Sequence, residues 1–286
     1  MRLGRRRRIL RKLAKDLNLR RLDGWTMPES GDRSPEVKLI LTEEGRLASL
    51  EGGRVIDATP SAGVAPSIAM NYLIENLKPI KLGELRSRYF PHVSLVSNGV
   101  ASQPRIELYL HQTPKIKLIL VSRNFVVEDN EACYEIARTL YQFLVERGAL
   151  SYYLLSGMRL TGERGVYIAS SDPNDAEIFL KSGAKLLRRL DEIPADKLSA
   201  YLMHFYSRMT GKAWLLIAEV MPYFPDPAAA RDLLRVLSRA LEFEIDLEKL
   251  EEEIEKQEAL MDEFRKDYER MLQERIRGDR RPLYIG

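Results

Sequence analysis

The hydrophobic pattern changes its period within residues 55–77. Residues 55–58 (Val-Ile-Asp-Ala) suit a half-buried strand, Pro60 and Gly63 break it, and Ser61 offers a side-chain oxygen near a helix start. Pro66 fits the first turn of a helix, where its missing N–H costs nothing, and apolar residues then recur at helical spacing as far as Leu77. A strand that leads directly into a helix through a loop of small residues is the opening unit of an α/β sheet, so we expect the chain to be organised around it.

The loop between this strand and this helix is a candidate anion site. The backbone N–H groups of Ser61, Gly63 and Val64 would point outward at the positive end of the helix. Neither nucleotide fingerprint, Gly-x-Gly-x-x-Gly or Gly-Lys-Ser/Thr, is present. The favoured interpretation is therefore a turn kept small so that helix and strand can pack closely.

The remaining apolar runs predict a sheet with helices between its strands. Residues 37–41 and 46–50 flank Glu44-Gly45 and predict a hairpin. Further strands are predicted at residues 81–89, 93–96, 106–110, 115–122, 152–156, 166–169 and 213–220. Helices are predicted at residues 131–147, 175–181, 194–209 and 227–241. The alternation in 106–110 predicts one wet face, whereas the apolar runs in 115–122 and 152–156 are typical of central strands.

The pattern changes again from Asp246 onward, where apolar side chains step by three and four. They are Leu247, Leu250, Ile254, Met261, Phe264, Tyr268 and Met271. This repeat over three heptads predicts a long helix, residues 246–278, that packs against a partner helix and contributes to an oligomer. Asp246 would cap the helix, and the acidic residues that follow favour its N-terminal end.

Composition indicates a soluble globular protein. The chain has 286 residues, of which 45% are hydrophobic and 30% charged. No apolar run approaches the ~20 residues of a membrane helix, and the basic N-terminus lacks the apolar segment of a secretion signal. The single cysteine, Cys133, excludes an intramolecular disulfide and falls within a helical pattern, where a buried thiol is expected. We therefore expect a cytoplasmic protein.

The net charge of +3 hides an asymmetry between one end of the chain and the rest. Residues 1–22 contain ten Lys or Arg and one acid, which gives +9 and leaves −6 for the remainder. Such a segment can touch nucleic acid, anionic lipid or an acidic protein surface, although a solvated or partner-docked terminus is the favoured interpretation. The prolines, serine and glycine of residues 24–35 predict a linker.

No catalytic or metal-binding set emerges from the spacing of reactive residues. The three histidines, His92, His111 and His204, lie on separate segments without a metal-ligand spacing. Ser156-Gly-Met is not a nucleophile elbow. Glu219 interrupts an apolar strand just before a proline-rich loop; it would be either a buried, perturbed carboxylate or, as we expect, a strand-end residue that reaches solvent. No metal or cofactor is predicted.

Several segments, in this order, resemble the proteasome assembly chaperone 2 family, particularly its archaeal homologues. Residues 58–65 (Ala-Thr-Pro-Ser-Ala-Gly-Val-Ala) are similar to the family's first turn, and residues 153–163 (Tyr-Leu-Leu-Ser-Gly-Met-Arg-Leu-Thr-Gly-Glu) to its middle. The most specific match is the strand, Pro-Asp-Pro turn and Ala-rich helix of residues 213–230. Residues 246–251 (Asp-Leu-Glu-Lys-Leu-Glu) resemble the start of the family's charged C-terminal helix. The resemblance covers roughly residues 37–275.

The resemblance implies a fold and a type of partner. It implies an α/β sandwich, a mixed β-sheet flanked by helices with the topology of nucleoside phosphorylases but without their chemistry. It also implies a homo-oligomer that binds proteasome α-subunits or related protein partners. Two departures weaken any nucleotide pocket: the first turn has Ser-Ala-Gly-Val where relatives often carry Gly-Val-Gly, and residues 193–208 lack a Gly-rich turn. The basic segment 1–22 has no counterpart in the family.

The end of the sequence resembles the hydrophobic-Tyr-any tail of proteasome activators, whose terminal carboxylate pairs with a lysine between α-subunits. Leu283, Tyr284 and Ile285 match that pattern, but Gly286 follows and displaces the carboxylate by ~3.3 Å of extended chain. Tyr284 could still fill a pocket, whereas the salt bridge would fail or shift its register. A tail that takes no part in binding is the equally weighted alternative.

The main hypothesis is an ATP-independent assembly chaperone or adaptor, not an enzyme. Its predicted parts are a basic segment and linker (1–35), an α/β domain (36–245), a long helix (246–278) and a tail (279–286). Two alternatives remain open. One is a phosphorylase-like or nucleotide-dependent enzyme that uses the loop 59–66 and Glu219; the other is nucleic-acid binding through residues 1–22.

Overall fold

The computed structural model describes residues 37–97, 99–160, 163–188, 195–221, 223–256 and Ala259. Within these residues a nine-stranded sheet has the order β1-β3-β6-β7-β2-β8-β11-β9-β10. Its strands are β1 (Val37–Leu41), β2 (Arg54–Ala58), β3 (Ile80–Ser87), β6 (Ile106–Gln112), β7 (Lys117–Ser122), β8 (Ser151–Met158), β9 (Val166–Ser170), β10 (Lys185–Leu186) and β11 (Ala213–Glu219). A separate two-stranded sheet comprises β4 (Leu95–Ser97) and β5 (Val100–Ser102).

The centre of the sheet is parallel, and both flanks begin with antiparallel pairs, although β10 at one edge runs parallel to β9. β7, β2, β8 and β11 run parallel to their neighbours in this order. The ladder continues antiparallel through β6, β3 and β1 on one side, and through β9 on the other. The central strands carry the continuous apolar runs, because helices cover both of their faces. The predicted α/β class with a mixed sheet flanked by helices is confirmed.

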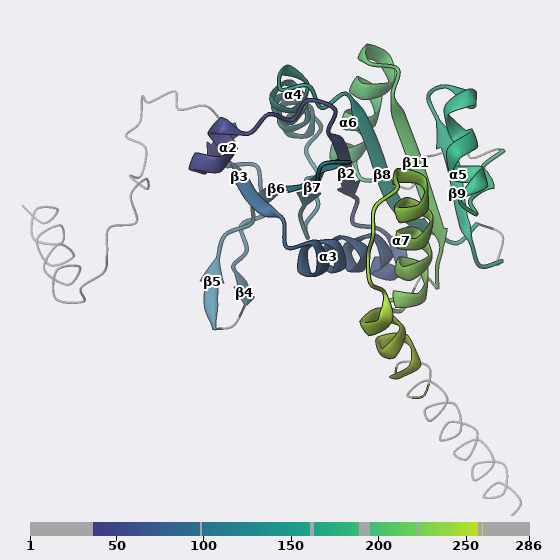
Figure 1. Cartoon of the computed structure of the whole chain (residues 1–286). Coiled ribbons are helices and arrows are strands. Elements are labelled where there is room, and N and C mark those ends of the chain that lie inside the picture. The colour runs from purple at the N-terminus through teal and green to yellow at the C-terminus, as the bar shows by residue number, and fades with distance from the viewer. Residues whose placement is uncertain are drawn as a thin grey trace, which may run out of the picture. The chain divides into compact units, whose positions relative to one another are not determined.

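Two helical layers enclose the sheet (Figure 1). The helical elements are α2 (Glu43–Leu47), η1 (Ala62–Val64), α3 (Ala65–Leu77), α4 (Asn130–Glu146), η2 (Pro173–Ala176), α5 (Glu177–Lys181), α6 (Lys197–Met209) and α7 (Pro227–Leu241). α3 and α7 pack together over one face, where Leu216 and Leu233 lie in the core. α4 and α6 pack together over the other, where Leu140 and Leu202 are buried with Cys133, as expected of that thiol. Burial raises the pKa of Cys133 to about 11.

The hairpin predicted at residues 37–41 and 46–50 is wrong in its second half. β1 forms, but its partner is β3, with Leu39 opposite Leu85. Residues 43–47 instead form α2, because the Thr42 side chain accepts a hydrogen bond from the Gly45 amide at 3.0 Å and caps this turn. A Cβ at Gly45 would overlap the Leu82 carbonyl oxygen, so the glycine lets the turn sit directly on β3.

The region after β3 holds a hairpin where the sequence predicts one strand at residues 93–96. β4 and β5 pair antiparallel, with Val96 opposite Ala101, and Gly99 between them has φ 76°. Val96 and Val100 are exposed, so this hairpin adds no core. It therefore lacked the burial signal by which strands are recognised in a sequence.

The predicted C-terminal helix is described only at its beginning, where residues 248–256 and Ala259 are helical. Asp246 accepts a hydrogen bond from the Glu248 amide at 2.9 Å, and its carbonyl oxygen accepts one from the Tyr72 hydroxyl at 2.9 Å. Leu250 and Ile254 are buried in the core between α3 and α7, and Leu247 packs against it. These three side chains thus contact their own chain, while Met261, Phe264, Tyr268 and Met271 lie outside the described residues. The predicted domain boundaries stay predictions.

Candidate docking surface at the carboxyl ends of the parallel strands

The loops that follow β2, β8 and β11 meet at one edge of the sheet. The three strands are parallel, and the register pairs Ala58 with Leu155 and Glu219 with Met158. The carboxyl ends of parallel strands are where open α/β sheets place their ligands, because the loops there are free to vary while the strands stay fixed. This edge is therefore the first place to look for a functional site.

Asp226 ties these loops to one another. Its carboxylate accepts hydrogen bonds from the Met221 amide at 3.1 Å and the Ala229 amide at 2.9 Å, which caps α7. Arg164, in the loop after β8, donates to the same carboxylate at 3.2 Å. The Asp226 amide in turn donates to the Gly63 carbonyl oxygen at 2.8 Å. One residue of the Pro-Asp-Pro turn thus fixes all three loops.

The predicted anion loop makes its contacts within the chain. The Ser61 hydroxyl oxygen accepts a hydrogen bond from the Gly157 amide at 2.9 Å, and the Val64 amide donates to the Ser61 carbonyl oxygen at 3.2 Å. Gly63 has φ +68°, and a Cβ there would lie 2.7 Å from the Cβ of Val220. These contacts favour the interpretation of a turn kept small for close packing, and anion binding at this loop stays a prediction.

Glu219 does not reach solvent, so the expectation of an exposed strand-end carboxylate is wrong. Only 6% of the residue is exposed, and both carboxylate oxygens lie within hydrogen-bond distance of the Leu160 amide, at 3.1 and 3.0 Å. Met158, which is paired with Glu219, is the last residue of β8, and Leu160 lies in the loop that follows it. The Glu219 carboxylate therefore holds the loop after β8 against the end of β11.

Apolar side chains are exposed on top of this fixed frame. Tyr223 is 88% exposed, Met221 55%, Phe224 52% and Val64 47%. We call these four residues the carboxyl-end surface. A cavity of ≈ 380 Å³ lies beside them and is lined by the buried Glu219 and Asp226 and by Arg159 and Arg164. Val64 also has φ 53°, a left-handed conformation that is strained for a β-branched residue and occurs most often at functional sites.

The chemistry of this surface suits docking. The two carboxylates beside the cavity already accept hydrogen bonds from backbone amides. Large apolar side chains held on a rigid frame are the usual anchors of protein interfaces, because they bury much area at little entropic cost. The sequence indicated the loop of residues 221–227 as a proline-rich end of a strand within the family resemblance, and it gave no sign that Tyr223 and Phe224 are exposed there.

A buried polar network lies beneath the neighbouring strand ends. Arg123 donates to both carboxylate oxygens of Asp196, at 2.6 and 2.8 Å, and to the Ser199 hydroxyl at 2.7 Å. Asp57 accepts hydrogen bonds from Ser199 at 2.7 Å and from Tyr152 at 2.6 Å. All of these side chains are buried or nearly so, and burial raises the pKa of Asp57. The network joins β2, β7, β8 and α6 and is closed to solvent, so its role here is structural.

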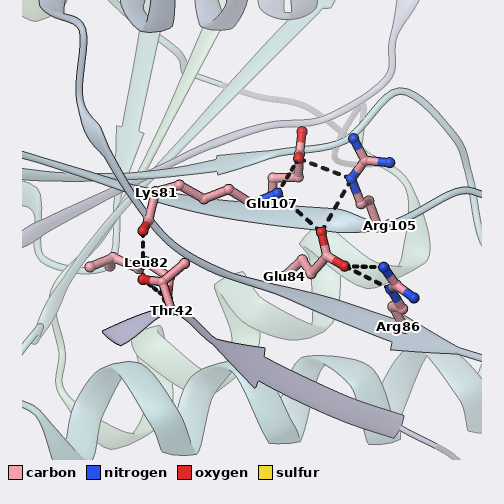
Figure 2. Close-up of polar contacts among 7 residues, drawn as sticks. All are labelled: Thr42, Lys81, Leu82, Glu84, Arg86, Arg105 and Glu107. Atoms are coloured by element: carbon pink, nitrogen blue, oxygen red, sulfur yellow. Dashed lines mark hydrogen bonds and ion pairs between the residues drawn. The ribbon is translucent and has the colours of Figure 1, made fainter. Parts of the chain in front are cut away.

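A second set of charges lies on the wet face of β3 and β6 (Figure 2). Glu107 accepts from Lys81 at 2.7 Å and from Arg105 at 2.9 Å, while Glu84 accepts from Arg86 at 2.7 Å. Burial alone would raise the pKa of Glu107, but the hydrogen bonds from Lys81 and Arg105 outweigh it and lower that pKa. Each of these charges has a partner of opposite sign. This face of the sheet carries the polar positions of the alternation that predicted one wet face for residues 106–110.

The other predicted candidates are placed as follows. The Nδ1 atom of His111 lies 3.2 Å from the Leu77 carbonyl oxygen, at the end of α3.

Among the described residues no group of His, Cys, Asp or Glu is arranged to hold a metal ion. Likewise, in that part of the chain no helix is both long and apolar enough to cross a membrane. Leu283, Tyr284, Ile285, Gly286 and the basic segment 1–22 lie outside the described residues.

The fold and this surface define an α/β protein that presents apolar side chains from rigid loops at one edge of its sheet. The chain belongs to the PAC2 family, whose model matches residues 55–265. It is 26% identical over 248 residues to protein MJ1210 of Methanocaldococcus jannaschii. This match covers 82% of this chain and 92% of that relative.

Solved structures share the fold. Pyrococcus furiosus PbaB, an archaeal proteasome activator, matches with a TM-score of 0.71 and 24% identity, over 80% of this chain and 99% of that chain. PbaA of the same organism, an archaeal homologue of proteasome-assembly chaperone, matches with a TM-score of 0.66 and 23% identity, over 86% and 97%. The predicted family is therefore confirmed.

Proposed function

We propose that this protein is an ATP-independent assembly chaperone or adaptor that binds proteasome α-subunits. The observation that carries the proposal is the match of its family and fold to PbaB and PbaA, which extends over 99% and 97% of those chains and over 80% and 86% of this one. The carboxyl-end surface supplies a contact of suitable chemistry, since Tyr223 and Phe224 are exposed on loops that Asp226 holds in place. Binding of this kind needs no chemical reaction, because the rigid fold only has to present the surface to the partner.

The competing enzyme hypothesis is less well supported by the geometry. That hypothesis required polar groups of the loop 59–66 and Glu219 to be available to a substrate. Instead, Ser61 accepts a hydrogen bond from the Gly157 amide of β8, and Glu219 accepts one from the Leu160 amide in the loop that follows. The buried Glu219 carboxylate is thus engaged in hydrogen bonds within the chain, as buried polar groups generally are.

Two further contacts belong to the proposal. The helix that begins at residue 248 would extend beyond Ile254 and pair with the same helix of another copy through Met261, Phe264, Tyr268 and Met271. The segment Leu283-Tyr284-Ile285 would be captured as an extended peptide, with Tyr284 as the anchor. The protein would then act as a cytoplasmic homo-oligomer that offers several binding segments to one α-ring, which increases avidity.

Capture of cognate proteasome α-subunits by the full chain tests this function. We expect the α-subunits to co-elute with the wild-type chain in gel filtration. Replacing Tyr284 with alanine, or deleting residues 280–286, should weaken capture if the tail is an anchor. Equal capture by all three chains would remove the tail from the proposal, and no capture by the wild type would contradict the function itself.

A further inference from the structure

A pocket separate from the carboxyl-end surface lies between α6 and the strands β9 and β11. Its volume is ≈ 550 Å³, within the range of small-molecule sites. The residues of α6 that line it recur every three or four positions, so they form one stripe of the helix; they are Ala200, Met203, His204, Ser207 and Arg208. The floor includes Ala169 and Leu215, which are paired in register on adjacent strands. The pocket therefore rests on rigid elements.

The charged side chains that line this pocket are cationic. They are Arg188 and Arg208, which lie there with the His204 imidazole, and among the residues that the structure describes no Asp or Glu lines the pocket. Within the described part of the chain, neither Arg188 nor Arg208 has a hydrogen bond or an ion pair. Arg123 and Arg164, by contrast, contact carboxylates. Two guanidinium groups around one pocket, with no counter-charge among the described lining residues, repel each other, and a bound anion would relieve that repulsion.

The hydroxyl groups also favour an acceptor-rich ligand. Ser170 and Ser171 donate their protons to the carbonyl oxygens of Asp172 and Gly211, each at 2.6 Å. The Ser207 hydroxyl has no such partner among the residues that the structure describes, so it can donate to a ligand together with the two arginines. The rest of the lining is apolar and includes Leu187 and Met203. A ligand that fits carries an anionic group at one end and an apolar body at the other.

We propose that this pocket binds an organic phosphate monoester. The phosphate pairs with Arg188 and Arg208, and the apolar body lies on Ala169, Leu187 and Leu215. A monoester carries close to two negative charges at pH 7 and three acceptor oxygens, which matches two guanidinium forks and a hydroxyl better than one carboxylate does. This binding is independent of the proposed α-subunit contact, because the pocket and the carboxyl-end surface share no lining residue.

Titration of the full chain with 1-naphthyl phosphate, followed by ligand fluorescence at low salt, tests the proposal. We expect saturable binding at millimolar concentration or below, with 1-naphthoate weaker and 1-naphthol not saturable. The double variant Arg188→Gln/Arg208→Gln should bind the phosphate about tenfold more weakly, because charge-assisted hydrogen bonds are lost. The control is Arg46→Gln. Arg46 is an exposed arginine on α2 that does not line the pocket, so this variant should bind the phosphate as the wild type does.

Three results would overturn the proposal. The first is the absence of saturable binding of 1-naphthyl phosphate to the wild type. The second is equal affinity for 1-naphthol, which would make the pocket merely apolar. The third is equal affinity of the double variant and the wild type, which would place the phosphate elsewhere. Both arginines are exposed, so the double variant should fold, and its melting temperature without ligand checks this.

Discussion

The amide of Asp226 donates a hydrogen bond to the carbonyl oxygen of Gly63 at 2.8 Å, although 163 positions separate the two residues in the sequence. This bond joins the loop after β11 to the loop after β2. Val64 and Tyr223 extend from these two loops, so one backbone contact sets the spacing of the apolar side chains that we assign to docking. A preformed surface of this kind binds with a smaller cost of ordering its backbone.

Replacing Gly63 with alanine should destabilise the protein more than the same change at Gly211. Both glycines have φ +68°, so both alanines incur the left-handed strain of about 1–2 kcal/mol. Only at Gly63 would the new Cβ also meet a neighbour, the Val220 Cβ at 2.7 Å, and overpacking adds about 1–3 kcal/mol. Urea denaturation of both variants measures the difference. Equal losses would show that Gly63 is not needed for close packing.

The buried ion pair predicts a large loss from a single substitution. The Arg123 side chain is fully buried, and Arg123→Met would leave two buried carboxylates, Asp57 and Asp196, without their cation. Breaking a buried pair in this way costs about 3–5 kcal/mol of unfolding free energy. The matched control is Arg138→Met, whose ion pair with Glu135 is half-exposed, and it should change the denaturation midpoint very little. Similar midpoints for both variants would contradict a stabilising role of the network.

The raised pKa of Asp57 predicts a pH-dependent effect of Asp57→Asn. Burial raises this pKa in the folded chain, so the folded state binds the proton more tightly than the unfolded state does. The stabilisation is complete below the ordinary aspartate pKa of about 4 and is lost as pH rises towards the raised value. Asparagine does not titrate. The unfolding free energy of the variant should therefore rise relative to the wild type across this window; a constant or falling difference would show that folding does not raise the pKa of Asp57.

Local patterns in the sequence were sufficient to predict most of the sheet. The alternation of residues 106–110 and the apolar run of 213–220 each report the burial of one strand, which the structure confirms. The helix at residues 43–47 could not be predicted in this way, because α2 is too short to show a hydrophobic period. It also depends on the close approach of Gly45 to the Leu82 carbonyl group, which is distant in sequence.

The site was harder to predict than the fold because it is made by contacts between distant loops. The Glu219 carboxylate accepts a hydrogen bond from the Leu160 amide, and Asp57 accepts one from Ser199, which is 142 positions away in the sequence. A charged residue at the end of an apolar strand, as at Asp57 and Arg123, was the available signal for the buried network. The exposure of Tyr223 could not be inferred, because a proline-rich loop gives no period from which its outer face can be identified.

Calorimetric titration of the full chain with cognate proteasome α-subunits measures the proposed binding itself. We expect saturable binding by the wild type, and about tenfold or greater weakening in Tyr223→Ala/Phe224→Ala, because buried aromatic anchors dominate interface energies. Leu47→Ala, which removes an 81% exposed leucine from α2, should bind as the wild type does. Binding by the double variant at wild-type affinity would contradict the assignment of the carboxyl-end surface, and no binding by the wild type would contradict the proposed function.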